Sequence, residues 1–346
     1  MMKIEAVDLF CGVGGLTAGL LKSGIQVKAG YDIELACRHA YEFNNKARFI
    51  HKDVAEVTGD EIKQWYSTGA IRLLAGCAPC QPFSTYNKGK DTTTDKKWPL
   101  LYHFSRLIKE VEPELVTMEN VPDVTKHKVY CDFIDELENL GYVITAQEVA
   151  CVDYGVPQTR RRHVVLASKL SKIELVKPTH KQPITVRETI FDLENLEAGQ
   201  KSKSDPLHVS SRLSEINLKR IRASKPGGTW RDWPEDLRAE CHKKVSGRFY
   251  SAVYGRMHWD QPAPTMTTLC YGFGNGRFGH PEQDRAISLR EAALFQTFPL
   301  NYQFTPIDKS VVFHTIGRMI GNAVPVRLGE IVGLSIINSL QTNYVV

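Results

Sequence analysis

Cys77 and Cys80 stand in a C-x-x-C spacing directly after the apolar segment 72–75. A cysteine at the end of a strand can act as a nucleophile if its surroundings favour the thiolate, since an ordinary thiol is mostly protonated at neutral pH. Such a pair can also be a redox couple, half of a metal site, or two buried structural cysteines. No second C-x-x-C or histidine pair follows at zinc spacing, which argues against a metal site. Pro79 and Pro82 flank Cys80 where a redox pair would open a helix, so a redox site is not favoured either.

A glycine-rich turn lies between the first predicted strand, 4–10, and a helix predicted at about 16–23. Gly12, Gly14 and Gly15 would let the backbone approach a ligand at the helix N-terminus, although tight-turn geometry alone would also explain them. The spacing differs from the G-x-G-x-x-G of dinucleotide-binding enzymes. It therefore favours a cofactor that contains adenosine but no pyrophosphate, and S-adenosylmethionine (SAM) fits that description.

Two acidic residues after further predicted strands fit the same interpretation. Asp32 ends the second strand, which begins at Gln26, and it follows Gly14 by 18 residues. A carboxylate there can accept hydrogen bonds from both ribose hydroxyls. Asp53 ends a third short strand and could bind the amino group of adenine. Three such positions at consecutive strand ends predict a nucleoside pocket.

Two further polar motifs lie near predicted strands. Glu119-Asn120-Val121-Pro122 follows the apolar run 115–118, where an isolated glutamate would normally be interpreted as a helix cap. Gln158 precedes three adjacent arginines, of which Arg160 and Arg162 would point the same way on an extended segment. Three adjacent arginines can also form a solvated edge.

The elements that must position these motifs change in character along the chain. Up to about residue 170, short apolar runs alternate with helical patterns, which is typical of a doubly wound, mostly parallel α/β sheet. After about residue 172, prolines and clustered glycines predict a smaller, irregular domain. The last helix is expected to pack back on the first domain. The remaining predicted strands are 72–75, 115–118 and 164–167, and the remaining predicted helices are 36–44, 288–297 and 323–340.

The composition is that of an ordinary globular protein of 346 residues, of which 42% are hydrophobic and 24% charged. No apolar run approaches the roughly 18 residues of a membrane span. The sequence start lacks a secretory pattern, and eight scattered cysteines fit a reducing, cytoplasmic compartment. The net charge is +5, but residues 201–248 hold 12 Lys/Arg against 6 Asp/Glu. This basic stretch would suit a phosphate-facing surface or, more plainly, a solvated face.

Taken together, the motifs resemble those of the DNA (cytosine-5)-methyltransferases, in the order that this family shows. The resemblance covers about residues 4 to 335. One departure is Ala78, because the family usually has two prolines before the catalytic cysteine and only Pro79 is kept. The motifs are Asp8-Leu9-Phe10 with Gly12, Gly14 and Gly15; Pro79-Cys80-Gln81 with Phe83-Ser84; Glu119-Asn120-Val121; Gln158-Thr159-Arg160-Arg161-Arg162; Arg290-Glu291 with Gln296, Phe298 and Pro299; and Gly321-Asn322-Ala323-Val324.

This resemblance implies a seven-stranded, mostly parallel SAM-methyltransferase sheet with helices on both faces, and a smaller, irregular target-recognition domain. The catalytic, SAM-binding domain is expected to comprise 1–172 and 312–346, and the target-recognition domain with its hinge 173–311. The implied activity is transfer of a methyl group from SAM to C5 of a cytosine in a specific double-stranded DNA sequence. The base would be flipped out of the duplex, because its C5 is otherwise stacked.

The resemblance also implies roles for single residues. Cys80 is expected to add to C6 of cytosine, and Glu119 to relieve the negative charge that then builds on the ring. Arg160 and Arg162 would bind the base or a phosphate, while Cys77 is expected to be a small buried residue. The implied cofactor-binding residues are Phe10, Gly12, Gly14, Leu16, Asp32, Ile33, Asp53, Pro79, Leu100 and Asn322. The implied DNA-binding residues are Gln81, Ser84, Arg248 and Arg277.

Two alternatives stay open at this point. A tRNA cytosine-5 methyltransferase of the same family would share the chemistry, but that branch carries a Cys-Phe-Thr tripeptide, whereas Cys270 is followed by Tyr271-Gly272. A non-catalytic DNA-binding relative would be expected to lack Cys80 or Glu119, and both are present. The expected partner is double-stranded DNA, with a cognate restriction endonuclease as a partner in function only. The protein is expected to be a cytoplasmic monomer without a metal.

Overall fold

The computed structural model describes residues 3–79, 99–244, 247 and 249–343, and the chain forms two compact units. Unit 1 comprises Met1–Tyr154, Arg161–Thr179 and Ala323–Val346. Unit 2 comprises Gly155–Arg160 and His180–Asn322. Unit 1 is therefore built from three separate stretches of the sequence.

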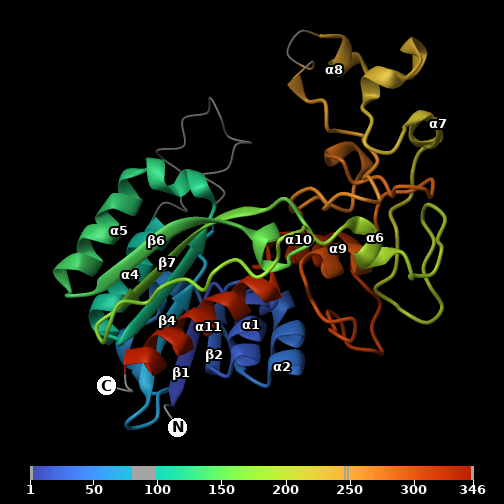
Figure 1. The fold of residues 1–346 in the computed structure, drawn as a ribbon. Coiled ribbons are helices and arrows are strands. Elements are labelled where there is room, and N and C mark those ends of the chain that lie inside the picture. Colours follow the sequence, from blue (N-terminus) through green and yellow to red (C-terminus); the bar gives the residue numbers. More distant parts are fainter. Residues whose placement is uncertain (1–2, 80–98, 245–246, 248, 344–346) are drawn as a thin grey trace. The chain divides into compact units, whose positions relative to one another are not determined.

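Unit 1 contains a seven-stranded sheet with the strand order β3-β2-β1-β4-β5-β7-β6 (Figure 1). The first four neighbouring pairs in this order are parallel, whereas β7 runs antiparallel to both β5 and β6. The predicted doubly wound, mostly parallel sheet is therefore confirmed. The strands are β1 (Ile4–Leu9), β2 (Gln26–Asp32), β3 (Arg48–His51), β4 (Ile71–Gly76), β5 (Leu115–Asn120), β6 (Val143–Ala150) and β7 (Arg161–Ser168).

Two strands differ from the sequence-based expectation. β6 was not predicted, because most of its residues are half-buried or exposed at the edge of the sheet and form no apolar run. β3 was expected to end at Asp53, but it ends at His51. Asp53 instead caps the 3-10 helix Val54–Glu56, where its carboxylate accepts the amide of Ala55 at 2.9 Å.

Helices cover both faces of the sheet, with α4 and α5 on one side and α1, α2 and α11 on the other (Figure 1). Ile62, Phe104 and Phe133, from three successive helices, join one apolar core with side chains of β1, β4, β5 and β7. The helices of unit 1 are α1 (Gly15–Ser23), α2 (Arg38–Asn45), α3 (Gly59–Lys63), α4 (Pro99–Val111), α5 (Lys128–Asn139) and α11 (Val326–Asn343).

The contact between α1 and α11 is close enough to require glycine. A Cβ at Gly19 would lie 2.3 Å from the carbonyl oxygen of Val326 and 2.4 Å from the amide nitrogen of Glu330. A Cβ at Gly329 would likewise lie 2.8 Å from the carbonyl oxygen of Leu16. The C-terminal helix therefore packs directly on the backbone of α1, the helix that follows the glycine-rich turn.

The run 313–342 is long and apolar enough to cross a membrane by length and composition, with a mean hydropathy of 1.4 in its most apolar window. It consists of α10 and α11, and 67% of this window is buried inside the protein. A core helix passes the same test, so this run does not indicate a membrane protein.

Unit 2 is assembled from short helices and turns. Within its described residues the structure assigns isolated bridges but no strand, and two of these bridges join Arg256 to Pro226 and to Gly279. Its helices are α6 (Val186–Ile190), α7 (Glu215–Ala223), α8 (Glu240–Lys243), α9 (Leu289–Phe295) and α10 (Phe313–Asn322). A small apolar cluster contains Ile221, Trp230, Trp233, Phe273 and Ala286.

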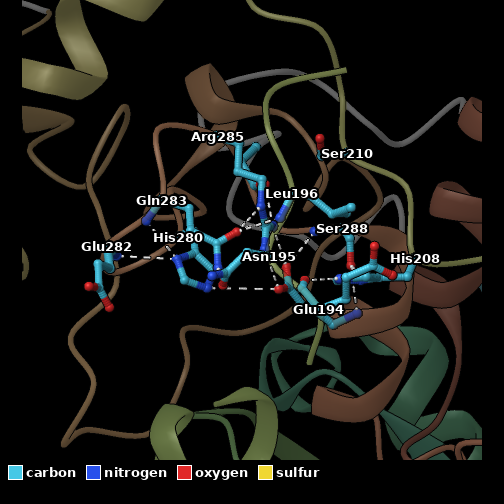
Figure 2. A network of polar contacts seen from close by, with 12 residues as sticks. Glu194, Asn195, Leu196, His208, Ser210, His280, Glu282, Gln283, Arg285 and Ser288 are labelled. Carbon is cyan, nitrogen blue, oxygen red and sulfur yellow. Dashed lines mark hydrogen bonds and ion pairs between the residues drawn. The ribbon is translucent and has the colours of Figure 1, made fainter. Parts of the chain in front are cut away.

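A buried polar network joins the loops of unit 2 (Figure 2). Arg285 donates to both carboxylate oxygens of Glu291 at 2.7 Å, and both residues are fully buried. His208 contacts the hydroxyl of Ser288 through Nδ1 at 2.8 Å and the carbonyl of Glu194 through Nε2 at 2.7 Å. Ser288 and Glu291 also form the capping box of α9, so the network holds the loop around His208 against this helix.

Candidate active site

The turn between β1 and α1 has the backbone of a ligand-binding loop. Phe10, Gly12 and Gly14 have positive φ values of 57, 51 and 88°, in the left-handed region that glycine adopts without strain. A Cβ at Gly12 would meet no atom within 4 Å, so the space beside it is open. Asp32 fixes the turn, because its two carboxylate oxygens accept the amides of Gly12 and Glu34, each at 2.8 Å.

The carboxyl ends of β1, β2 and β3, which are neighbours in the sheet, carry the groups predicted to bind adenosine. Burial raises the pKa of Asp32, although the backbone amides that it accepts oppose this shift. Each carboxylate oxygen has a second lone pair that a ribose hydroxyl could use. Ile33 is 66% exposed, and Asp53 caps the turn after β3. An exposed apolar side chain suits the face of an adenine, and carboxylates suit its amino group and the ribose hydroxyls, so these residues fit SAM.

The other predicted cofactor residues have different surroundings. The side chain of Leu16 belongs to the core, with 4% exposure, so a contact with the cofactor would have to come from its backbone. Pro79 and Leu100 are both half-buried. Asn322 is the last residue of α10 in unit 2 and is exposed.

Asp8 is a buried acid of β1 that belongs to the glycine-turn motif. Its Oδ2 accepts the hydroxyl of Thr17 at 2.7 Å, and Thr17 also contacts the hydroxyl of Tyr41 at 3.0 Å. Within the described residues its Oδ1 has no hydrogen-bond partner. Burial outweighs the hydrogen bonds from Thr17 and, with the charge of Asp32, raises the pKa of Asp8 to about 7. Its neutral form is therefore favoured below neutral pH.

Glu119 lies near the carboxyl end of β5 and is 6% exposed. Its Oε1 forms an ion pair with Nε of Arg162 on β7 at 2.7 Å, and its Oε2 lies 2.7 Å from Sγ of Cys77. The next residue, Asn120, donates from Nδ2 to the carbonyl of Ala78 at 3.2 Å. Side chains therefore join the ends of β4, β5 and β7 around one buried carboxylate.

Cys77 is not the small buried residue that the sequence predicted. It is half-buried, and its thiol donates to Glu119. The contact depends on the parallel pairing of β4 with β5, which brings together residues from two separate motifs. A motif search along the sequence gives no signal for such a contact.

Arg160 and Arg162 do not share a partner, although their alternation suggested that they would point the same way. Arg162 pairs with Glu119, whereas Arg160 is 3% exposed and donates from Nη1 to the carbonyl of Met266 at 2.9 Å. Gln158 accepts the amide of Met266 at 2.9 Å and donates to the carbonyl of Phe295 at 2.7 Å. Gln158 and Arg160 thus brace the backbone of unit 2.

The predicted nucleophile, Cys80, lies outside the described residues, as do Gln81, Ser84 and Arg248. Arg277 is described: it is half-buried, and its Nη1 donates to the carbonyl of Gly228 at 2.5 Å. Burial lowers the pKa of Arg277. In the described part of the chain, no group of three or more His, Cys, Asp or Glu residues is arranged to hold a metal ion.

Solved structures with a similar fold are methyltransferases. One is described as a DNA modification methyltransferase encoded within an E. coli prophage; it has a TM-score of 0.75 and 23% identity, covering 98% of this chain and 100% of that one. Another is the S. pombe Dnmt2 methyltransferase, with a TM-score of 0.67 and 17% identity, covering 99% of this chain and 100% of that one. These likenesses establish the methyltransferase fold.

Residues 4–338 match the model of the C-5 cytosine-specific DNA methylases, so the chain belongs to this family and is a DNA cytosine-5 methyltransferase. It is 53% identical to the Type II methylase M.HgiDII of Herpetosiphon aurantiacus, over 97% of this chain and 95% of that protein. It is 31% identical to the Type II methyltransferase M1.BsuMI of Bacillus subtilis, over 96% of this chain and 80% of that protein. Membership of the family implies the use of SAM.

Proposed function

We propose that the protein methylates C5 of a cytosine flipped out of a specific double-stranded DNA sequence, through a transient covalent bond between Cys80 and C6. The observation that carries this proposal is the buried Glu119 carboxylate, which Arg162 holds at the end of β5. An acid in such a place can exchange a proton with the N3 edge of a pyrimidine. Family membership supports the assignment of Cys80 as its nucleophilic partner.

The reaction needs a nucleophile because C5 of cytosine is itself a weak one. Addition of the Cys80 thiolate to C6 breaks the C5–C6 π bond, and its electron pair spreads to N3, where Glu119 supplies or shares a proton. When bound, SAM supplies the electrophilic methyl group that C5 takes up. Loss of the C5 proton to a base, return of the N3 proton to Glu119 and departure of Cys80 as a thiolate restore the C5–C6 double bond, so no oxidant or reductant is consumed.

The surroundings of Glu119 suit this role. A carboxylate buried without a countercharge would be costly, and Arg162 provides that charge at Oε1. Oε2 is held by a thiol, which is a weak donor. Oε2 is therefore the oxygen with the weaker partner, and its second lone pair can face an incoming base.

SAM would be held at the carboxyl ends of β1, β2 and β3. Asp32 would accept the ribose hydroxyls, Ile33 would cover a face of adenine, and Asp53 would take its amino group. The open backbone beside Gly12 would accommodate the rest of the cofactor. The remaining residues proposed for this site are Phe10, Gly14, Leu16, Pro79, Leu100 and Asn322.

Unit 2 would read the DNA sequence, with its basic stretch 201–248 facing the phosphates. Gln81, Ser84, Arg248 and Arg277 are the proposed DNA contacts. Flipping the target base costs a few kcal/mol, which contacts with the surrounding duplex must offset. We further propose a cytoplasmic monomer that a restriction endonuclease accompanies in function only.

The test is transfer of tritiated methyl groups from SAM to unmethylated DNA, with tRNA in parallel and bisulfite sequencing of the labelled DNA. Wild type should label cytosines within one DNA sequence, and Cys80→Ala should abolish the label. Glu119→Gln should lower the rate by about 100-fold or more. Glu148→Gln is the matched control. Glu148 is an exposed residue of β6 that pairs with Arg161 on β7, so its replacement should leave the rate unchanged.

Two outcomes would overturn the proposal. Label in tRNA alone would indicate the tRNA-modifying alternative. Absence of label from both nucleic acids, with SAM binding intact, would indicate a non-catalytic DNA-binding relative.

A further inference from the structure

The backbone around Cys77 is fixed by both neighbouring strands of unit 1. The amide of Cys77 donates to the carbonyl of Leu9 at 3.3 Å, which extends the pairing of β4 with β1 by one residue. The carbonyl of Ala78 accepts the side chain of Asn120, from the end of β5. The thiol therefore projects from a strand end whose position is set by the sheet.

The two oxygens of Glu119 have different partners. Oε1 meets a guanidinium from β7 and Oε2 meets the Cys77 thiol after β4. The terminal torsion of a glutamate, about its Cγ–Cδ bond, is only weakly restricted. A single ion pair at Oε1 therefore leaves the orientation of the carboxylate plane unfixed. A second contact, from a different strand, removes this freedom.

We propose that the Cys77 thiol is a positioning residue for Glu119: its hydrogen bond from Sγ to Oε2 fixes the plane of the carboxylate, so that the acid meets the cytosine ring in one orientation. This inference rests on the role of Glu119 proposed above. A carboxylate oxygen has two lone pairs, so Oε2 can keep the thiol contact while it faces the arriving base. Cys77 does not itself contact the reacting atoms.

A role in packing alone makes different predictions for the same variants. Free cysteine often serves as a small apolar residue. In that case alanine would be a mild replacement, and serine, which introduces a polar hydroxyl, would be no better. If the thiol acts as a hydrogen-bond donor, serine preserves the contact and alanine removes it.

The test compares Cys77→Ala with Cys77→Ser in steady-state methyl transfer from SAM to unmethylated DNA, at temperatures well below the unfolding of either variant. Cys77→Ala should lower kcat by about 5- to 10-fold, the effect of losing one hydrogen bond of ordinary strength, as expected for a weak thiol donor, with KM for DNA and SAM changed by less than about twofold. Cys77→Ser should restore kcat to at least about half of the wild-type value. The same two replacements at Cys131, an exposed cysteine of α5, are the matched controls and should change neither constant.

Either an unchanged kcat in Cys77→Ala, or an equal loss in Cys77→Ala and Cys77→Ser, would overturn the inference. The double variant Cys77→Ala with Glu119→Gln should be no slower than Glu119→Gln alone, because the thiol acts only through the carboxylate. An additive loss would also contradict the inference. If Glu119→Gln itself kept wild-type kcat, the proposed function of Glu119 would fail first, so the two failures are distinguishable.

Discussion

Asp8 in unit 1 and Glu291 in unit 2 are both fully buried carboxyl groups, but their pKa values are displaced in opposite directions. Burial raises the pKa of Asp8 to about 7, since the hydrogen bonds that it accepts come from the uncharged Thr17. Burial would also raise the pKa of Glu291, but the charge and hydrogen bonds of Arg285 outweigh it and lower the pKa to about 2. A fully buried carboxyl group thus favours its neutral form at Asp8 below about pH 7 and its ionised form at Glu291.

The difference reflects how the two units are built. In unit 1 the sheet and its helices enclose a large apolar core. There Asp8 accepts a hydrogen bond from the uncharged Thr17, whereas the buried Glu119 of the same unit is paired with Arg162. In unit 2 the described loops are fixed by buried cations. Arg256, for example, donates to the carbonyls of Ile221, Ser224 and His280. Unit 1 is thus built around its apolar core, with ion pairs at single buried acids, whereas buried arginines fix the described loops of unit 2.

Glu291→Gln should lower the free energy of unfolding more than the other stability variants below, because it leaves the fully buried Arg285 without a countercharge. Breaking a buried pair in this way costs about 3–5 kcal/mol. Urea denaturation should show an early transition in the variant, and sequence-specific DNA binding should be lost.

Asp260→Asn is the matched control, since Asp260 pairs with Arg187 at 2.8 Å on the surface of the same unit. An exposed pair contributes little, so this variant should unfold like wild type. Equal stability of the Glu291 and Asp260 variants would contradict the view that buried charge holds unit 2 together.

Gly19→Ala tests the apolar packing of unit 1. The added methyl group would meet the backbone of α11, and overpacking of this kind costs about 1–3 kcal/mol. We expect a lower melting temperature and weaker SAM binding by calorimetry. Ala18→Ser, one position earlier on α1, is the control. If the melting temperature of Ala18→Ser were as low as that of Gly19→Ala, the result would count against the close helix contact.

Asp8→Asn should change how stability depends on pH. The folded protein holds the Asp8 proton up to a pKa of about 7, against an ordinary value of 3.8. This contribution to stability is complete below about pH 3.8 and is lost as the pH rises through 7. The variant should therefore show a flatter stability profile between pH 4 and 7, with a gain of about 1–2 kcal/mol at pH 8.

Glu291 has the opposite dependence and gives the contrast. Its folded pKa of about 2 lies below the ordinary 4.5, so its contribution is present above pH 4.5 and is lost as the pH falls toward 2. Denaturation of Asp8→Asn and Glu291→Gln across the pH range checks both directions in which stability is expected to change with pH. An Asp8→Asn profile parallel to wild type between pH 4 and 7 would show that Asp8 is ionised in the folded protein.

The strands that carry apolar runs, such as β1 and β5, could be predicted from the sequence because both faces of the sheet are covered by helices. β6 could not, since an edge strand with exposed residues has no such run. Asp32 at the end of β2 was also predictable, whereas Asp53 lies two residues beyond the end of β3. The separate partners of Arg160 and Arg162 were not, because they depend on which segments fold against each residue.

The relation between Cys77 and Glu119 shows the same limit at the site itself. Each residue belongs to a recognisable motif, and each motif predicts chemistry at a strand end. The contact between them depends on the register of β4 against β5, which the spacing of residues along the chain does not contain. Local patterns predict which groups are present, and the pairing of strands decides which of them meet.

The most direct test of the central claim uses duplex DNA with 5-fluorocytosine at the target position. Fluorine at C5 cannot leave as a proton does, so the covalent bond between enzyme and base should persist after methyl transfer. Incubation with SAM should give a complex that survives a denaturing gel with wild type and is absent with Cys80→Ala. A stable complex formed by Cys80→Ala, or none formed by a wild-type enzyme that methylates ordinary DNA, would contradict the account.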